Sequence, residues 1–339
     1  MSNLERRPDE VELRASVVRA VDVVEARKAA IGDGTEVRRL LPSRALRTIG
    51  AWCFLDHYGP DDVSAGPGMQ VPPHPHTGLQ TVSWLFDGLV LHRDSLGSQQ
   101  LIRPGELNLM TSGRAVAHSE ESPAPEPAAA GERSPGAQLL GARTARPAQL
   151  HGIQLWIALP EERRHGDPDF AHHAGLPVFT DADGSRVTVV VGEYRGERSP
   201  AAVYTPLTGL EIVLPAAGQV TLPATEGFEY GVLAADGPAR VSAGDGRQQA
   251  LIDVGTLAHL PAGVPSVTLS SAGPGRFLVL GGVPLGEKLV MWWNFVGRTH
   301  EEIVTARNAW DQGEFGVVHG YAGNPLPAPP LPPGRLTAR

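Results

Sequence analysis

Cysteine and lysine are almost missing from this chain of 339 residues. The single cysteine, Cys53, excludes an intrachain disulfide. It lies in the apolar run 51–55, where we expect a buried structural thiol and not a nucleophile. The basic residues are 27 Arg and only 2 Lys, and the net charge is −8. This acidic balance argues against direct nucleic-acid binding, which depends on cationic patches.

Long apolar runs are also missing. No uninterrupted stretch approaches the length of a membrane span, and the charged first ten residues lack the apolar centre of a signal peptide. We therefore expect a cytoplasmic protein without a membrane partner. The hydrophobic fraction of 41% and charged fraction of 19% are typical of a globular chain. Its length is sufficient for two domains.

Glycine and proline are abundant, with 40 and 31 residues, and they divide the chain into short segments rich in Val, Leu, Ile and Thr. Such punctuation predicts strands joined by turns, an all-β fold of the barrel or sandwich kind. The clearest predicted strands are residues 81–86, 89–92, 153–159, 187–191 and 276–280.

One helix is predicted near the end of the chain, over residues 299–312. Thr299 and Glu302 have the spacing of a capping box, and Ile303, Ala306 and Trp310 follow on one helical face until Gly313. Two segments have the composition of unstructured chain: residues 122–147, rich in Ala, Pro, Gly and Arg, and the proline-rich tail 325–334.

An internal repeat joins the two halves of the chain. Asp87-Gly88 recurs as Asp236-Gly237 at an offset of 149, and residues 97–100 recur at 246–249 with the same offset. With one residue inserted, Ile102, Gly105, Leu107 and Gly113 match residues 252, 255, 257 and 263. The conserved order and spacing predict two copies of one β domain.

Two pairs of polar residues have the spacing of metal ligands on strands. His74 and His76 are two residues apart, as are His118 and Glu120. Side chains at i and i+2 share one face of a strand, so both pairs can point into one pocket. Three imidazole nitrogens and one carboxylate suit a single divalent ion, Fe(II) first, with Mn, Ni, Cu or Zn as alternatives.

The repeat provides an internal control for this constellation, because a lone His-x-His also occurs on surfaces and in satisfied cores. At offsets of 149 and 150 the four positions become Pro223, Thr225, Thr268 and Ser270. All four candidate ligands disappear together while turn and core positions persist. We therefore expect a metal site in the first domain and none in the second.

The spacing pattern gives less support for the roles of residues that neighbour the four candidate ligands. His57 and His92 could donate hydrogen bonds to the ligands, although a structural role is the favoured interpretation for both. By parity with His76, the residues Gln80, Val82, Trp84 and Phe86 are expected to line an apolar pocket suited to a flat organic ligand.

Several of these segments together resemble the pirin family of bicupins. They are residues 74–82 (HPHTGLQTV), 92–97 (HRDSLG), 103–105 (RPG), 110–114 (MTSGR) and 118–120 (HSE), with 54–60 (FLDHYGP) before and 292–296 (WWNFV) after them. The resemblance covers most of residues 35–312. It implies two tandem cupin (jelly-roll) β-barrels, over residues 35–165 and 175–290, followed by the helix at 299–312.

The resemblance also implies a metal site and an activity. The family's three His ligands and one Glu ligand fall on His74, His76, His118 and Glu120, and the family metal is iron. Pirins commonly have Glu where Gln80 stands, so this chain departs from the pattern at one position. Some members are quercetin 2,3-dioxygenases, which implies ring cleavage of a small flavonol-like aromatic. Glu120 would then be the catalytic base.

The alternative hypothesis is a non-enzymatic iron-binding regulator. Some pirins are described as partners of transcription factors or metabolic enzymes, and the oxidation state of the iron would then change a surface that a protein partner recognises. Oxygen uptake with a flavonol distinguishes the two hypotheses.

Overall fold

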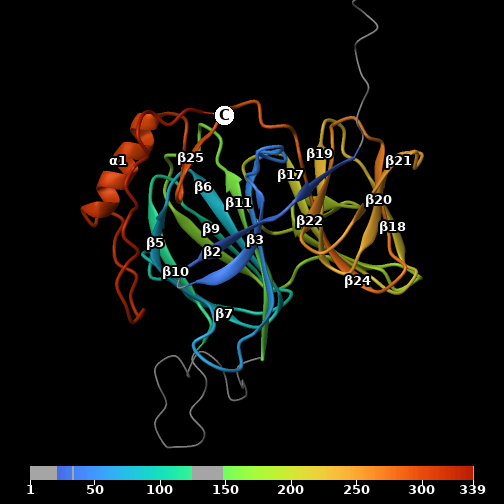
Figure 1. The fold of residues 1–339 in the computed structure, drawn as a ribbon, viewed down its shortest axis with the longest axis horizontal. Helices are drawn as coiled ribbons and strands as arrows, with labels where there is room; N and C mark the ends of the chain where they lie inside the picture. Colours follow the sequence, from blue (N-terminus) through green and yellow to red (C-terminus); the bar gives the residue numbers. More distant parts are fainter. Residues whose placement is uncertain (1–20, 33, 124–147, 339) are drawn as a thin grey trace, which may run out of the picture.

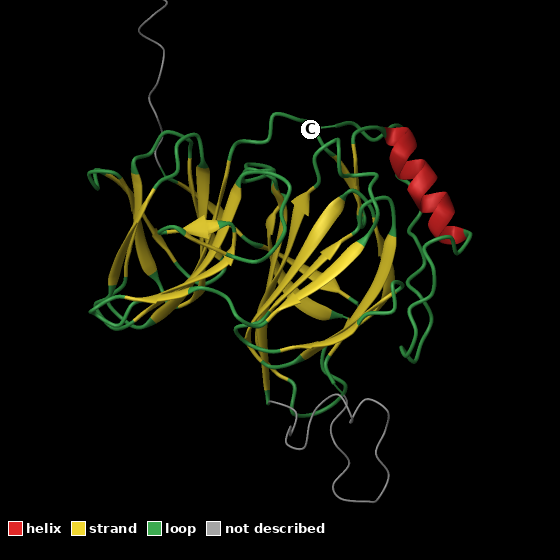
Figure 2. Cartoon of the chain, turned by 180° about the vertical axis from the view of Figure 1, so that it is seen from behind, coloured by secondary structure: helices red, strands yellow, loops and turns green. Residues whose placement is uncertain are grey.

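The computed structural model describes residues 21–32, 34–123 and 148–338. Two β-barrels lie side by side, and the single helix of the described chain covers the outer side of the first barrel (Figures 1 and 2). The all-β prediction, with two tandem cupin barrels and a short C-terminal helix, is confirmed. Of the segment 122–147 predicted to be unstructured, residues 124–147 lie outside the described ranges. No helix among the described residues is long and apolar enough to cross a membrane.

The first barrel is built from two antiparallel sheets that face each other. Its larger sheet has the strand order β12 (Asp169–His173), β9 (Leu107–Thr111), β6 (Leu79–Asp87), β11 (Gln149–Ala158), β4 (Trp52–Asp62), β3 (Thr35–Leu41) and β2 (Arg27–Ile31). Its smaller sheet has the order β5 (Gln70–His76), β10 (Val116–Glu121), β7 (Val90–Asp94) and β8 (Gln99–Ile102).

The second barrel has the same plan of seven strands facing four. The larger sheet has the order β1 (Asp22–Glu25), β22 (Thr256–Leu260), β19 (Glu229–Asp236), β24 (Gly275–Gly282), β17 (Leu207–Leu214), β14 (Arg186–Val191) and β13 (Val178–Thr180). The smaller sheet has the order β18 (Gln219–Pro223), β23 (Ser266–Ser270), β20 (Ala239–Ala243) and β21 (Gln248–Ile252).

Two short hairpins accompany the barrels. They are β15 (Glu193–Tyr194) with β16 (Glu197–Arg198), and β25 (Val290–Trp292) with β26 (Phe295–Gly297). The five strands expected from the sequence are all present, as β6, β7, β11, β14 and β24.

Corresponding strands of the two barrels confirm the internal repeat. In the first barrel Val90 of β7 lies opposite Ile102 of β8, and in the second Ala239 of β20 lies opposite Ile252 of β21. These pairs reproduce the offsets of 149 and 150 read from the sequence. The two halves of the chain are therefore copies of one β domain.

One strand from the start of the described chain belongs to the second barrel. This strand, β1, pairs with β22, where Val24 lies opposite Leu257. In the first barrel the corresponding place, beside β9, is taken by β12, which directly follows β11 in the chain. Within the described residues, the second barrel is thus completed by a strand that precedes the first barrel in sequence.

A shared apolar core joins the two barrels. Side chains of the larger sheets meet in one buried cluster, which includes Trp52, Trp84 and Leu155 from the first barrel and Leu233 and Leu278 from the second. Trp52 is fully buried and its indole Nε1 donates to the carbonyl of Gly281 at 3.3 Å. Because an interface this apolar resembles a domain interior, the barrels should move as one body.

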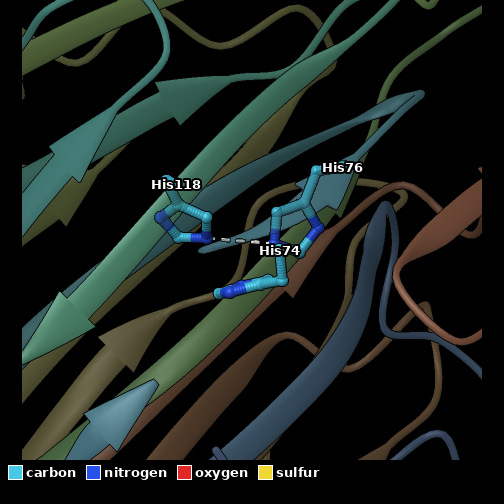
Figure 3. A group of neighbouring side chains, drawn as sticks. All are labelled: His74, His76 and His118. Atoms are coloured by element: carbon cyan, nitrogen blue, oxygen red, sulfur yellow. Dashed lines mark hydrogen bonds between the residues drawn. The ribbon is translucent and has the colours of Figure 1, made fainter. Parts of the chain in front are cut away.

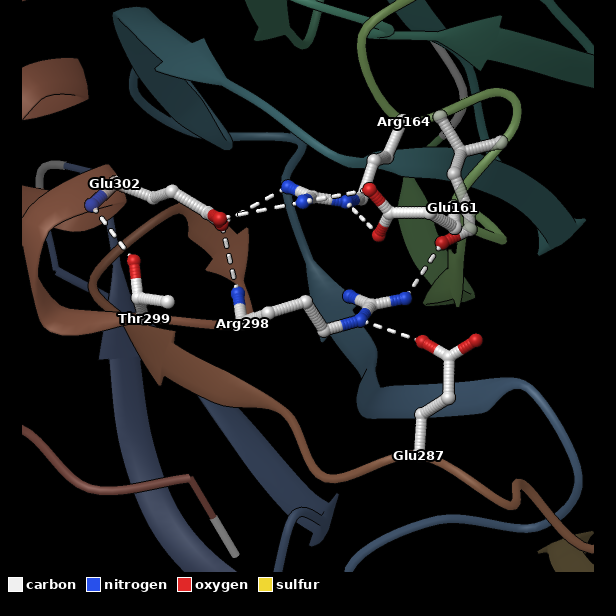
Figure 4. Close-up of polar contacts among 7 residues, drawn as sticks. Glu161, Arg164, Glu287, Arg298, Thr299 and Glu302 are labelled. Atoms are coloured by element: carbon white, nitrogen blue, oxygen red, sulfur yellow. Dashed lines mark hydrogen bonds and ion pairs between the residues drawn. The ribbon is translucent and has the colours of Figure 1, made fainter.

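Helix α1 (His300–Asp311) is fixed to the first barrel by polar contacts (Figure 4). Thr299 caps the helix by accepting from the Glu302 amide at 3.2 Å, as predicted. The Glu302 carboxylate accepts from Arg164 Nη1 at 2.9 Å and from the Arg298 amide at 2.8 Å. Ile303, on the predicted apolar face, is buried against the barrel.

Candidate metal centre

Strands β5 and β10 bring three histidines together inside the first barrel. Their rings turn toward one another from the two neighbouring strands (Figure 3), and one nitrogen from each lies within 4.8 Å of the others. His74 lies directly opposite His118 in the strand pairing, and Nε2 of His76 lies 3.0 Å from Nε2 of His118. The three histidines selected by their spacing therefore lie on adjacent strands of one sheet and line one cavity.

Local sequence explains why β5 presents both histidines inward. The pairing of β5 with β10 contains a bulge, because the step from His118 to Glu120 faces the longer step from His74 to Val71. Pro72 and Pro73 occupy the bulge, and β5 is the outer strand of its sheet, where proline's missing N–H costs no ladder bond. Because of the bulge, Val71 and His74 line the same cavity although they are three residues apart.

The imidazole nitrogens have divided roles. Nδ1 of His74 lies 2.9 Å from the Pro72 carbonyl, and Nδ1 of His76 lies 3.2 Å from the Asn294 carbonyl. A carbonyl only accepts, so Nδ1 carries the proton in both rings and Nε2 keeps its lone pair. Burial lowers the pKa of His74 to about 4 and those of His76 and His118 well below the ordinary value. Neutral imidazoles with free Nε2 atoms fit a divalent metal ion.

Glu120 lies in the same pocket as the three histidines. One of its carboxylate oxygens lies within 4.8 Å of ring nitrogens of His118 and His92, and Oε1 accepts a hydrogen bond from Ser83 Oγ at 2.6 Å. Burial raises the pKa of Glu120, which the hydrogen bond from Ser83 partly opposes. The carboxylate is therefore available to the pocket and held in one orientation.

His92 has a role at this site that the sequence pattern did not favour. Its Nδ1 lies 3.3 Å from Nδ1 of His118, and its Nε2 lies 3.2 Å from Oδ2 of Asp94. Burial alone would raise the pKa of Asp94, but hydrogen bonds from His92 and the Ser98 amide hold it below its ordinary value. The Asp94 carboxylate and the imidazoles of His92 and His118 thus form a line of polar contacts that ends at the pocket. The spacing of His92 and Asp94, two residues apart on β7, was the available signal.

Replacing His92 by phenylalanine is expected to weaken metal binding by about 10- to 100-fold, because the hydrogen bond that orients His118 is lost. Phenylalanine preserves the stacking of this ring on Phe170, whose centroid is 4.5 Å away. Competition with a chromophoric chelator measures the affinity. The Phe170→Leu variant removes the stacking alone and serves as the control. Equal affinity of His92→Phe and the unmodified chain would contradict this role.

The pocket beside the histidines is a cavity of about 330 Å³, within the usual range for small-molecule sites. Phe54 and Trp156 form one wall and stack on each other with ring centroids 3.9 Å apart. The Trp156 ring meets His76 edge-on at 5.1 Å. At its margin Arg39 pairs with the buried Asp56 at 2.6 Å, and both residues line the pocket.

The expectation that Val82, Trp84 and Phe86 line this pocket is wrong. All three belong to the core between the barrels. The turn at Thr77 and Gly78 interrupts the alternation between β5 and β6, so the odd positions of β6, including Ser83, face the metal centre. The prediction assumed that even-numbered residues face the same side in β5 and β6, and the turn between these strands breaks that alternation.

Gln80 also faces away from the metal centre. Its Nε2 donates to Thr111 Oγ1 at 2.9 Å and to the Ala202 carbonyl at 3.0 Å, and the side chain is fully buried. Ala202 precedes β17 of the second barrel. The departure from the family pattern at this position therefore alters the contact between the barrels and not the surroundings of the histidines.

Strand pairing corrects the alignment of the two copies at the site itself. Pairing through β20 places Val267 at the position of His118, Leu269 at that of Glu120 and Leu222 at that of His74, one residue from the positions expected. All three side chains are buried in the apolar core of the second barrel. The second copy has replaced its polar cluster by packed aliphatic side chains.

His57 belongs to a separate buried cluster. Its Nε2 lies 2.8 Å from Nε2 of His151, and the Arg38 guanidinium contacts the same ring at 3.3 Å. Burial, together with Arg38 and His151, lowers the pKa of His57 to about 2. Cys53 is buried and free, as expected, and burial raises its pKa to about 12.

Two tandem cupin barrels, of which the first encloses a cluster of histidines that could hold a metal ion, define a metal-binding bicupin. Residues 34–157 match the family model described as Pirin, and residues 209–316 match the Pirin C-terminal cupin domain. The chain belongs to the pirin family.

Individual relatives extend over nearly the whole chain. A Pseudomonas aeruginosa protein named "putative quercetin 2,3-dioxygenase" is 42% identical over 337 residues, covering 98% of each chain. A pirin-like protein of Caulobacter vibrioides is 34% identical and covers 91% of this chain and 98% of its own. A crystal structure described as quercetin 2,3-dioxygenase from Acinetobacter baumannii is 39% identical, with a TM-score of 0.82 over 94% of this chain and 98% of that one.

Proposed function

We propose that this protein is a metal-dependent dioxygenase that cleaves the ring of a flavonol or a related enol-bearing aromatic. The observation that carries the proposal is the placement of three neutral histidines and a carboxylate in a cavity with a flat aromatic wall. The names of one relative and one solved structure, 42% and 39% identical to this chain, support the same class of substrate.

The proposed ligands are Nε2 of His74, His76 and His118 together with Glu120, and the proposed ion is Fe(II). When bound, the metal supplies Lewis acidity toward a substrate hydroxyl and the redox chemistry that O2 requires. The residues themselves bind and orient the substrate. The stacked rings of Phe54 and Trp156 offer a planar apolar surface beside His76.

Glu120 is the proposed base. Its Oε1 is held by Ser83, so Oε2 is the oxygen proposed to take the proton of the substrate's enolic hydroxyl. Burial raises the pKa of this carboxyl, which makes it a stronger base than an exposed glutamate. Trp293 and Leu326 line the same cavity and would exclude water while the ring is bound.

Oxygen uptake by the iron-loaded chain with a panel of flavonols tests the proposal. The Glu120→Gln variant is expected to lose about 10²- to 10⁴-fold in kcat, the range for a general base. Glu121→Gln is the matched control, because Glu121 pairs with Arg93 and does not line the cavity. Uptake no faster than that of free iron would reject the dioxygenase. Equal rates for Glu120→Gln and the unmodified chain would reject Glu120 as the base.

A further inference from the structure

The proline-rich tail is held against the first barrel, contrary to the disorder expected from its composition. Leu326 is fixed through both of its backbone groups. Its amide donates to the carbonyl of Pro73 at 2.8 Å, and its carbonyl accepts from Trp310 Nε1 at 2.9 Å. Pro73 directly precedes His74, on the outer edge of β5. The tail therefore spans from helix α1 to the strand that carries the histidines.

Further contacts anchor the tail beyond Leu326. Arg307 Nε donates to the Pro329 carbonyl at 3.0 Å, and the Leu336 amide donates to Nδ1 of His300 at 3.1 Å. Leu331 and Leu336 pack on the apolar cluster beneath α1. Six prolines between residues 325 and 334 restrict the backbone, so ordering this segment costs less entropy than ordering a flexible linker. We call residues 325–336 the C-terminal strap.

The strap contributes one side chain to the metal-centre cavity. Leu326 lines it together with Trp293 and Asn294, from the turn of the β25–β26 hairpin. Trp293 has a positive φ of 52°, which a bulky residue adopts only when its surroundings hold it there. It lies beside Phe295 and Trp310, with centroids 5.5 and 6.5 Å away. Two C-terminal segments thus complete a cavity whose chemistry lies in the N-terminal barrel.

We infer that Leu326 is a specificity-determining residue, which limits the size of the aromatic ligand admitted to the metal-centre cavity. The inference rests on the proposed function for the identity of that ligand. Leu326 is held by hydrogen bonds at both of its backbone groups, and the following chain is held at Pro329 and Leu336, so its side chain forms a fixed boundary. With the C-terminal strap in place, the cavity admits a planar flavonol without a sugar group and excludes a flavonol glycoside.

Two measurements on the full chain test the inference. The first is the rate at which diethyl pyrocarbonate modifies His74 and His76 in chelator-treated protein, followed by peptide mass spectrometry, with the exposed His319 as internal reference. Leu326→Ala should raise this rate severalfold and Leu326→Trp should lower it. Val317→Ala, which truncates a residue that lies between α1 and the C-terminal strap and is 65% exposed, should not change it.

The second measurement is the KM of the iron-loaded chain for a flavonol and its glycoside. Leu326→Ala should lower the KM for the glycoside by about 10-fold, as expected for added room in an apolar pocket, and change that for the flavonol much less. Unchanged modification rates in both Leu326 variants would overturn the inference even if flavonols are oxidised. Altered modification rates of His74 and His76 without any flavonol oxidation would support Leu326 as the boundary of the cavity and reject the proposed function.

Discussion

Replacing His76 by alanine is expected to abolish binding of a stoichiometric metal ion and, with it, any oxygen uptake. His76 belongs to the cluster, with Nε2 3.0 Å from that of His118 and Nδ1 fixed by the Asn294 carbonyl. Loss of an orienting partner alone costs about 10- to 100-fold in metal affinity, so loss of a ligand should cost at least about 100-fold. Elemental analysis of the purified protein measures the metal content directly.

Thermal unfolding gives an independent check on the same variant. A metal that binds only the folded chain stabilises it by about 2.7 kcal/mol when its concentration is 100 times Kd. Added metal should therefore raise the melting temperature of the unmodified chain and of His165→Ala, at an exposed position, but not that of His76→Ala. A metal-dependent shift in His76→Ala would reject this residue as a ligand. A second equivalent of metal in the unmodified chain would contradict the single site.

Replacing His57 by glutamine is expected to make the free energy of unfolding less dependent on pH below 6.5. In the folded chain burial, Arg38 and His151 lower the pKa of His57 to about 2, whereas the unfolded chain has an ordinary histidine pKa near 6.5. Below pH 6.5 the unfolded state therefore binds a proton that the folded state does not. The stability of the folded chain with neutral His57 is fully present above pH 6.5 and is progressively lost as the pH falls toward 2.

The size of this pH effect on the free energy of unfolding follows from proton linkage. One such histidine removes about 1.4 kcal/mol of stability for each pH unit below 6.5, so nearly 3 kcal/mol is lost over two units. Urea unfolding at pH 7, 6 and 5, at equal metal content, measures the slope for each chain. His57→Gln should show the smaller slope, and His319→Gln, at an exposed position, should match the unmodified chain. Identical slopes for all three would show that His57 protonates freely in the folded state.

The histidine cluster was predictable because the information is local. On a strand the spacing i, i+2 determines the shared face, and this property needs no knowledge of the neighbouring strands. The repeat was equally accessible, because turn residues such as Asp87-Gly88 and Asp236-Gly237 keep their order in both copies. Thr299 and Glu302 likewise predicted the start of α1, because capping depends only on residues within one helical turn.

The errors arose where distant segments meet. Parity failed at Gly78, since a turn can reverse the face of the next strand without a signal in composition. His92 was undervalued because its neighbour His118 lies beside it only through the pairing of β7 with β10. The tail was expected to be unstructured because its prolines form no regular hydrogen-bonded element. Its order comes from donors and acceptors on β5 and α1, which composition does not reveal.

The pairing of β1 with the second barrel has a consequence for biosynthesis. Asp22 of β1 pairs with His259, which the ribosome adds 237 residues later, since 259 − 22 = 237. At about 5–20 residues per second the wait lasts on the order of 10–50 s. By contrast, the last strand of the first barrel, β12, follows directly on that barrel's other strands. Nascent chains should therefore be able to pair all strands of the first barrel early, whereas β1 has no partner strand until the residues up to His259 have been synthesised.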